Sequence, residues 1–256
     1  MKLVLIGSGN TATVLARKFF ASGHNMLQVW SRNSIHAREL AEEVQAQVLD
    51  SLQEISAEAD LVIIAVSDQS LPDVAAQLQL HQRQPVVHTA GAVSREVLNS
   101  CSAQYGVFYP LQSLRKEADP VSPIPCLVDA STTHLLQQLK ELAESISPQV
   151  QVASDEQRLH LHLAAVLVNN FTNHLYEWAF RICQRHQLDF QLLKPLAIET
   201  ALRLSSKPPG LLQTGPARRN DTDTLEKHRE LLADDAQLKS LYENLTDSIL
   251  AMYDKK

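Results

Sequence analysis

The 256-residue chain has few of the features that mark specialised protein classes. It has three cysteines, an odd number with no C-x-x-C pair, which excludes a disulfide scaffold and indicates reduced thiols in a cytoplasmic protein. The apolar run Leu3 to Ile6 is too short for a signal-peptide core, and no later run approaches the length of a membrane span. With 23 basic and 29 acidic side chains, the net charge of -6 gives no electrostatic case for binding nucleic acid or a membrane. We therefore expect a cytoplasmic protein with a small-molecule partner.

Signatures of metal and nucleophilic catalysis are also missing from the sequence. There is no H-E-x-x-H, and His160 and His162 are two residues apart on a predicted helix, so they point in different directions. We therefore expect no metal site. No G-x-S-x-G turn or cysteine-centred motif supports hydrolysis by a nucleophile. Any chemistry must then come from a bound cofactor.

Apolar runs of strand length alternate with helix-length segments over roughly the first 150 residues, a pattern typical of a parallel sheet covered by helices. The run Leu61 to Val66 has no polar alternation, which predicts a central strand buried on both faces. Strands are predicted near residues 2–7, 26–31, 60–67, 85–88, 105–109 and 124–129, and helices over 10–22, 34–46, 70–79 and 131–145.

Helical periodicity replaces this alternation after Val152. Ser154 and Gln157 have the spacing of a capping box, and residues 155–186 contain no glycine or proline, which predicts one long helix. Further helices are predicted over 189–205, 221–233 and 235–254, with a loop over 207–216. The fold class is therefore α/β: a doubly wound sheet domain, residues 1–153, followed by an all-α domain, residues 154–256. The apolar density of residues 159–182 predicts a homodimer.

The first predicted strand leads directly into G-x-G-x-x-A, formed by Gly7, Ser8, Gly9, Asn10, Thr11 and Ala12. In this motif the first glycine permits a tight turn and the second lets the backbone approach a pyrophosphate. The alanine keeps the following helix close to the strand. The helix N-terminus then offers free N–H groups to the anion. These residues are predicted to bind a dinucleotide.

The end of the second predicted strand indicates which dinucleotide. An NAD site usually has an acidic residue here, but the sequence reads Trp30, Ser31, Arg32, Asn33, and no acid occurs before Glu39. Arg32 can contact the 2′-phosphate of NADP, with hydrogen bonds from Ser31 and Asn33. The alternative is a solvated arginine in a helix-capping turn. We expect NADP as the cofactor.

Polar residues follow three later strands at the edge where doubly wound sheets bind ligands. Val66 and Ser67 are candidates to contact the nicotinamide, and His88 is a candidate catalytic group. Tyr109 and Gln112 are candidates to line the substrate cleft. For Ser67 and His88, helix or loop capping is an equal alternative.

Polar residues also interrupt the predicted helical domain. Asn169, Asn170, Asn173 and His174 lie in an apolar stretch, and they either face a cleft or satisfy one another within a helical core. Arg218 and Arg219 follow a glycine-bearing loop that can close over an anionic substrate or can be a solvated basic loop.

Six segments together resemble a known family: G-S-G-N-T-A at 7–12, V-S-D at 66–68, H-T-A-G at 88–91, G-V-F-Y-P-L-Q at 106–112, N-N-F-T-N-H at 169–174 and Q-T-G-P-A-R at 213–218. They resemble bacterial two-domain oxidoreductases that pair a Rossmann-like NADP-binding domain with a helical domain of unknown function. These proteins are similar to pyrroline-5-carboxylate reductases, deazaflavin-dependent NADP reductases, and 6-phosphogluconate and 3-hydroxyisobutyrate dehydrogenases.

The resemblance implies a helical domain like the C-terminal domain of 6-phosphogluconate dehydrogenase and a substrate cleft between the domains. It also implies that Gly7, Gly9, Asn10, Ser31 and Arg32 bind NADP.

One position departs from the hydroxyacid dehydrogenases that the chain resembles. Those enzymes have a catalytic lysine one helical turn before an asparagine, and here Val166 occupies the position four residues before Asn170. Valine cannot act as an acid or base. We therefore expect reduction of a small carbonyl or imine, with Asn170 and His174 orienting the substrate and His88, His174, Tyr109 or water donating the proton. The alternative is a non-catalytic protein that binds NADP as a sensor or scaffold.

Overall fold

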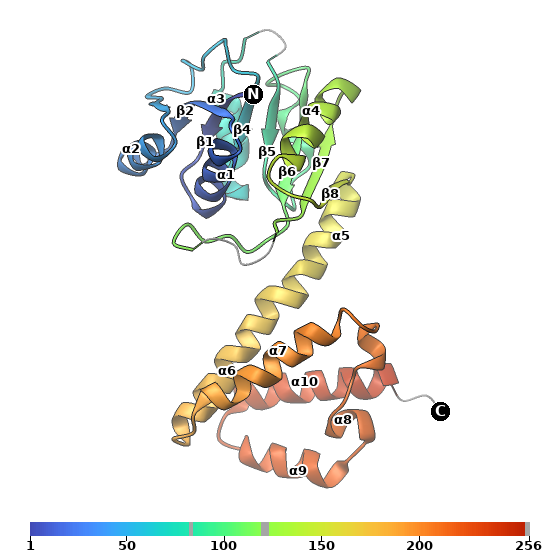
Figure 1. Cartoon of the computed structure of the whole chain (residues 1–256). Coiled ribbons are helices and arrows are strands. Elements are labelled where there is room, and N and C mark those ends of the chain that lie inside the picture. Colours follow the sequence, from blue (N-terminus) through green and yellow to red (C-terminus); the bar gives the residue numbers. More distant parts are fainter. Residues whose placement is uncertain (82–83, 119–122, 254–256) are drawn as a thin grey trace. The chain divides into compact units, whose positions relative to one another are not determined.

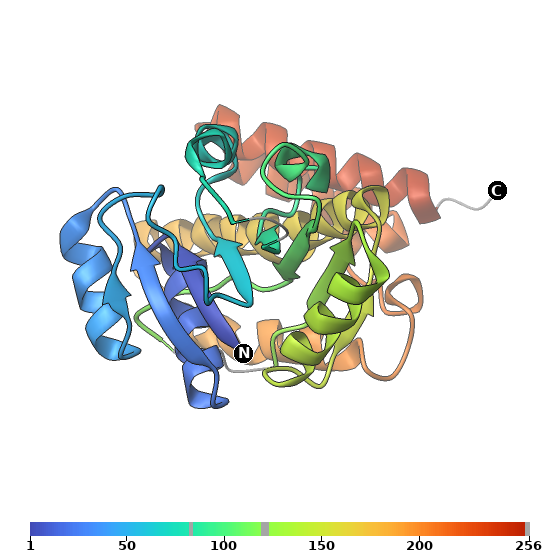
Figure 2. The same cartoon turned by 90° about the horizontal axis from the view of Figure 1, so that it is seen from above.

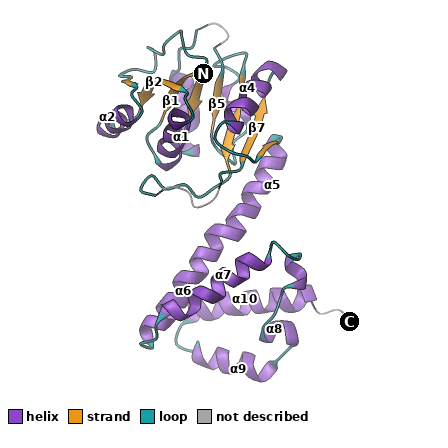
Figure 3. Ribbon diagram, viewed as in Figure 1, coloured by secondary structure: helices purple, strands orange, loops and turns teal. Residues whose placement is uncertain are grey.

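A computed structural model describes residues 1–81, 84–118 and 123–253 of the chain (Figure 1). The chain divides into two compact units, Met1–Asn170 and Phe171–Lys256. All the strands lie in the first unit, and the described part of the second is helical (Figure 3). Within the described ranges, no helix is both long enough and apolar enough to cross a membrane.

The first unit contains one eight-stranded sheet with the strand order β3-β2-β1-β4-β5-β6-β7-β8. Neighbouring strands are parallel except β6 and β7, which are antiparallel. The order reverses between β1 and β4, which is the switch point where doubly wound sheets bind ligands. The strands are β1 (Lys2–Ile6), β2 (Asn25–Trp30), β3 (Gln47–Val48), β4 (Leu61–Ile64), β5 (Val86–His88), β6 (Tyr105–Pro110), β7 (Cys126–Ala130) and β8 (Val150–Val152).

Helices cover both faces of this sheet, so each strand buries alternate side chains in different cores. In β1, Leu3 and Leu5 face one core, and Val4 and Ile6 face the other. Figure 2 shows α4 (yellow-green) and α3 (teal) on opposite faces. The first core packs under α1 (Asn10–Ala21), α2 (Ser34–Glu43) and α4 (Thr133–Glu144), and the second under α3 (Leu71–Gln77) and the 3-10 helix η2 (Arg95–Leu98). All four residues of β4 are buried, which confirms the predicted central strand.

The long helix predicted over 155–186 is interrupted. It consists of α5 (Asp155–Ala165), a π-helical turn η3 (Val166–Phe171) and α6 (Thr172–Arg185). The capping box predicted at Ser154 and Gln157 is confirmed, with both reciprocal hydrogen bonds present. The division between the two compact units falls within the π-helical turn, between Asn170 and Phe171. The domain boundary predicted after residue 153 coincides with the start of α5. The division into a sheet domain and a helical domain at that point stays a prediction.

Short helices and connections complete the second unit. Its remaining elements are η4 (Phe190–Leu193), α7 (Lys194–Arg203), η5 (Pro209–Leu211), α8 (Pro216–Arg219), α9 (Thr222–Leu231) and α10 (Ala236–Tyr253). His228 of α9 is 2.8 Å from the Tyr242 hydroxyl of α10, and Arg185 forms an ion pair of 2.7 Å with Asp235. The stretch predicted as a loop over 207–216 contains the 3-10 helix η5.

Candidate functional site

The turn between β1 and α1 has the geometry of a phosphate-binding turn. Gly7 has φ +130°, and a Cβ at this position would lie 2.2 Å from the Ala65 carbonyl oxygen, so the turn requires glycine. Gly9 is the N-cap of α1, and no atom lies within 4 Å of the place where its Cβ would be. Ala12 is fully buried below the turn, where it packs the helix close to the sheet. The first N–H groups of α1 have no side-chain cap, and the residues of the turn line the cleft described next.

This turn opens into the first cleft, of about 530 Å³, which runs along the carboxyl edge of the sheet. The predicted residues that line it are Gly7, Ser8, Gly9, Asn10, Thr11, Ser31, Arg32, Val66, Ser67, Tyr109 and Gln112. Trp30, Asp68, Thr89, Gly91 and His162 line it as well, although they were not predicted as site residues. One surface thus joins segments that lie far apart in the sequence.

At the β2 end of the first cleft, Ser31 and Arg32 are the polar residues. The Ser8 hydroxyl donates a hydrogen bond of 2.7 Å to the Ser31 hydroxyl, which ties the turn to β2. Arg32 is exposed and forms no ion pair with any residue of the described ranges. Asn33 caps α2 instead: its side-chain oxygen accepts from the N–H groups of Ile35 and His36. A free guanidinium at this position suits a phosphate on the adenosine ribose.

At the other end of the first cleft, Tyr109 and His162 form a hydrogen-bonded pair. The Tyr109 hydroxyl on β6 lies 2.9 Å from His162 Nδ1 on α5. Burial and the negative charge of Asp68 raise the pKa of Tyr109 above its usual value, and the Arg158 guanidinium opposes the rise. The phenol therefore holds its proton at neutral pH.

A second cleft, of about 520 Å³, adjoins the first and shares Tyr109, Gln112 and His162 with it. The rest of its lining is mostly apolar and comes from the segment after β6, from α5 and from the π-helical turn: Leu111, Ser113, Leu161, Ala164, Ala165, Val166, Val168, Asn169 and Asn170. Of the residues predicted to orient the substrate or to donate the proton, Tyr109 lines both clefts and Asn170 lines the second. His88 and His174 are not among the described lining residues of either cleft.

His88 is buried below the edge of the sheet. Its Nδ1 accepts from the Ala90 N–H at 3.1 Å, and its Nε2 lies 3.3 Å from the Ser94 carbonyl oxygen. Burial, assisted by the Arg158 charge, lowers the pKa of His88 to about 4. The ring is therefore neutral at pH 7, and both nitrogens hold the loop that follows β5.

The remaining predicted site residues lie in the second unit, where the structure shows only their local contacts. Trp178 donates a hydrogen bond of 2.9 Å to Nε2 of His174, one helical turn earlier in α6. The Arg218 guanidinium lies 5.1 Å from the centre of the Tyr253 ring. The roles of Asn173, His174, Arg218 and Arg219 toward a substrate stay predictions.

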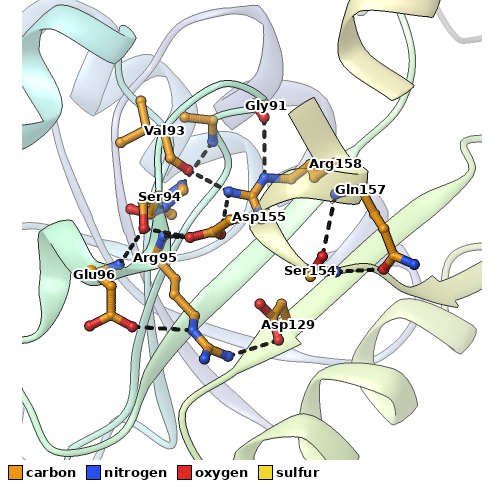
Figure 4. Close-up of polar contacts among 12 residues, drawn as sticks. Gly91, Val93, Ser94, Arg95, Glu96, Asp129, Ser154, Asp155, Gln157 and Arg158 are labelled. Carbon is orange, nitrogen blue, oxygen red and sulfur yellow. Dashed lines mark hydrogen bonds and ion pairs between the residues drawn. The ribbon is translucent and has the colours of Figure 1, made fainter. Parts of the chain in front are cut away.

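An ionic cluster around the buried Arg158 ties the start of α5 to the loop after β5 (Figure 4). Arg158 is 1% exposed, and its Nε donates to the Gly91 carbonyl oxygen at 3.2 Å. Its Nη2 donates to the Val93 carbonyl oxygen and, at 2.7 Å, to Asp155. Asp155 also accepts from the Ser94 hydroxyl. Burial alone would raise the pKa of Asp155, but these hydrogen bonds outweigh it and lower the pKa.

Comparisons with known proteins agree with this geometry. Residues 2–91 match the domain family described as NADP oxidoreductase coenzyme F420-dependent, and residues 124–249 match DUF2520, a domain of unknown function. No curated protein matches the sequence.

Among solved structures, a "putative NADP oxidoreductase", BF3122 from Bacteroides fragilis, is 38% identical, with a TM-score of 0.88 and 98% coverage of both chains. Protein TM1727 from Thermotoga maritima is 24% identical, with a TM-score of 0.81, over 99% of this chain and 100% of that one. A reductive aminase from Aspergillus terreus, in complex with NADPH and ethyl-5-oxohexanoate, is 15% identical with a TM-score of 0.75, over 98% and 94% of the two chains.

Proposed function

Because the chain belongs to the family of NADP oxidoreductases that join a dinucleotide-binding domain to a DUF2520 domain, we propose that it transfers hydride from NADPH to the carbon of a C=N or C=O bond. The observation that carries this proposal is the first cleft. Within one unit this cleft brings together an uncapped helix N-terminus, an arginine suited to a 2′-phosphate and the carboxyl ends of the neighbouring strands β4, β5 and β6.

The residues along this cleft fit NADPH in the way that doubly wound sheets bind dinucleotides, with the molecule lying across the carboxyl ends of the strands. The turn at Gly7 and Gly9 would hold the pyrophosphate, because Gly9 leaves room for a close approach to the backbone and no side chain caps the N–H groups of α1. Ser31 and Arg32 would hold the phosphorylated ribose, and no carboxylate among the described lining residues competes at this end. The nicotinamide would lie across the switch point, near Val66, Thr89 and Tyr109.

The second cleft supports a small, largely apolar substrate. Beside the apolar residues, its lining includes Gln112, Asn169 and Asn170, whose polar groups can orient a single C=N or C=O group. Val166 is part of this lining, at the position where the resembled dehydrogenases have lysine. Reduction of an imine demands less of the protein than oxidation of an alcohol, because an iminium carbon accepts hydride readily.

Calorimetric titration with NADPH, NADP⁺ and NADH tests the cofactor assignment. Replacing Arg32 by alanine should weaken NADPH binding by about 1.5–3 kcal/mol, the value of a hydrogen bond to a charged group, and leave NADH binding unchanged. Arg38→Ala is the matched control, because Arg38 is exposed on α2 and outside the described lining of the first cleft.

Two outcomes would count against the proposed function. If none of the three nucleotides binds, the glycine turn is architectural and the cofactor assignment is wrong. If NADPH binds but is not oxidised with any of a panel of aldehydes, ketones and cyclic imines, the protein is a non-catalytic NADP-binding sensor or scaffold.

We further propose that the protein works as a homodimer in the cytoplasm. Support for the dimer comes from large apolar side chains exposed along α5, the π-helical turn, α6 and α7, among them Leu163, Phe171, Phe180, Ile198 and Leu202. Support for a reducing compartment comes from the free thiols of Cys101, Cys126 and Cys183.

A further inference from the structure

Tyr109 and His162 lie where the two clefts meet. Three described residues line both clefts, and of these Gln112 does not ionise, whereas Tyr109 and His162 can both exchange a proton. The pair therefore lies between the strand ends that would hold the nicotinamide and the apolar cleft that would hold the substrate.

The backbone at Gly91 leaves room for this pair and helps to position it. A Cβ on Gly91 would lie 2.7 Å from His162 Nδ1 and 2.9 Å from Tyr109 Cζ, so the missing side chain makes room for both rings. The carbonyl oxygen of the same glycine accepts from Arg158, which is one helical turn before His162 on α5. The buried Arg158 thus anchors α5 to the loop that carries Gly91, and in this way it holds His162 within hydrogen-bonding distance of Tyr109.

On the basis of the proposed function, we propose that Tyr109 is the proton donor of the reduction and that His162 returns the proton to it. The substrate carbon takes up hydride with both electrons, and the π pair of its C=N or C=O bond moves to nitrogen or oxygen. The Tyr109 O–H bond then breaks, and its proton forms the new N–H or O–H bond. A proton from solvent reaches the phenolate through the His162 ring, which restores the phenol.

The protonation of Tyr109 suits the role of proton donor, and the surroundings of His88 do not. The phenol is protonated at neutral pH because burial and Asp68 disfavour the phenolate, so it is ready to donate. His88 is the other histidine near this edge of the sheet, but it is buried and both of its ring nitrogens bond to the backbone.

The need for a proton distinguishes two kinds of substrate. A neutral imine must gain a proton as the electron pair reaches its nitrogen. An N-methylated iminium ion becomes a tertiary amine by gaining hydride alone. A proton donor matters for the first substrate and not for the second, whereas a residue that only shapes the cleft matters for both.

The test compares Tyr109→Phe with wild type on a five-membered cyclic imine and on its N-methylated iminium salt, at a pH where the imine is neutral. The variant should lower kcat for the imine about a hundredfold or more and change kcat for the iminium salt by less than about twofold. Its affinity for NADPH, measured by fluorescence titration, should be unchanged. Tyr105→Phe is the matched control on the same strand, since the Tyr105 hydroxyl bonds to Glu96 and lines neither cleft.

A measurement without cofactor tests the pairing itself. The near-ultraviolet absorbance difference between wild type and Tyr109→Phe, recorded as pH rises, follows the ionisation of Tyr109. His162→Leu should shift this ionisation, and His160→Leu should not, because His160 is exposed and bonds to the Glu156 carbonyl oxygen of its own helix.

Each contrary result has a distinct meaning. If wild type reduces both substrates and Tyr109→Phe reduces the imine equally well, the proton-donor role is wrong and the proposed function stands. If the variant loses both activities equally, Tyr109 only shapes the cleft and the proton-donor role is wrong. If His162→Leu leaves the ionisation of Tyr109 unchanged, the role of His162 in returning the proton is wrong. If wild type reduces neither substrate nor any other imine or carbonyl compound, the proposed function itself is wrong.

Discussion

His88 and His162 lie near the same edge of the sheet, yet their surroundings give them different chemistry. His88 directly follows an apolar strand, so the sequence marks it as a candidate, but the sequence does not show that both ring nitrogens bond to the backbone. His162 has no local signal, because it reaches the cleft only through the way α5 packs on the loop after β5. Sequence reasoning therefore finds the residues of the glycine turn and misses a group that is placed by tertiary packing.

At the residue scale, His88 predicts a dependence of stability on pH. Burial holds its pKa at about 4, whereas an unfolded histidine has a pKa of about 6.5, so the unfolded chain takes up a proton first as the pH falls. The contribution of His88 to the free energy of unfolding is complete above about pH 6.5 and falls by about 3 kcal/mol as the pH drops to about 4.

Urea denaturation across this pH range measures the effect. His88→Gln should remove this part of the pH dependence, whatever its effect at pH 7, and His36→Gln, on the exposed face of α2, should keep it. An unaltered pH dependence in His88→Gln would show that the histidine is not buried as a neutral group.

At the element scale, periodicity predicted the elements with large apolar faces and missed those without them. The strands β1, β2, β4, β5, β6 and β7 were predicted, although β4 is shorter than the predicted range 60–67. The strands β3 and β8 lie at the two edges of the sheet, have two and three residues, and carry too little apolar alternation to be recognised. The π-helical turn is also not predicted from the sequence, because its residues have ordinary helical periodicity.

The attachment of α5 gives a prediction at this scale. Arg158→Met removes the buried guanidinium that donates hydrogen bonds to two loop carbonyl oxygens and to Asp155. The variant should therefore have a free energy of unfolding lower by about 2–4 kcal/mol. It should also lower imine reduction, because His162 loses its anchor. Arg181→Met is the control: its ion pair with Glu177 is exposed and should contribute less than about 1 kcal/mol. Equal effects in the two variants, measured by urea denaturation, would contradict the anchoring role of Arg158.

At the scale of the whole molecule, the second unit leaves much apolar surface uncovered. No residue of α7 is buried, and Leu196, Ile198 and Leu202 are 65%, 59% and 63% exposed. A monomer rarely exposes so many large apolar side chains on one helix, since removing apolar surface from water against a second chain is favourable. The proposed homodimer would provide that cover.

Ile198→Glu should therefore shift the protein toward monomers, because a carboxylate at a buried interface is costly to desolvate. Light scattering at micromolar concentration measures the change. Ile35→Glu is a matched control, since Ile35 is 66% exposed on α2 and lies in the sheet unit. A monomeric wild type, or dimers in both variants, would contradict an interface that includes α7.

The π-helical turn has a consequence for how the chain can change in length. A π-helical turn holds one residue more than an α-helical turn, so removing one residue from it would restore a regular α-helix and leave the residues of α6 in nearly the same orientation about the helix axis. Asn169 and Asn170 lie within the turn, and they would then leave the face that lines the second cleft. Loss of a residue from this turn should therefore disturb the second cleft and spare the packing of α6. Loss of a residue within α6 itself would rotate every later residue of that helix by about 100°.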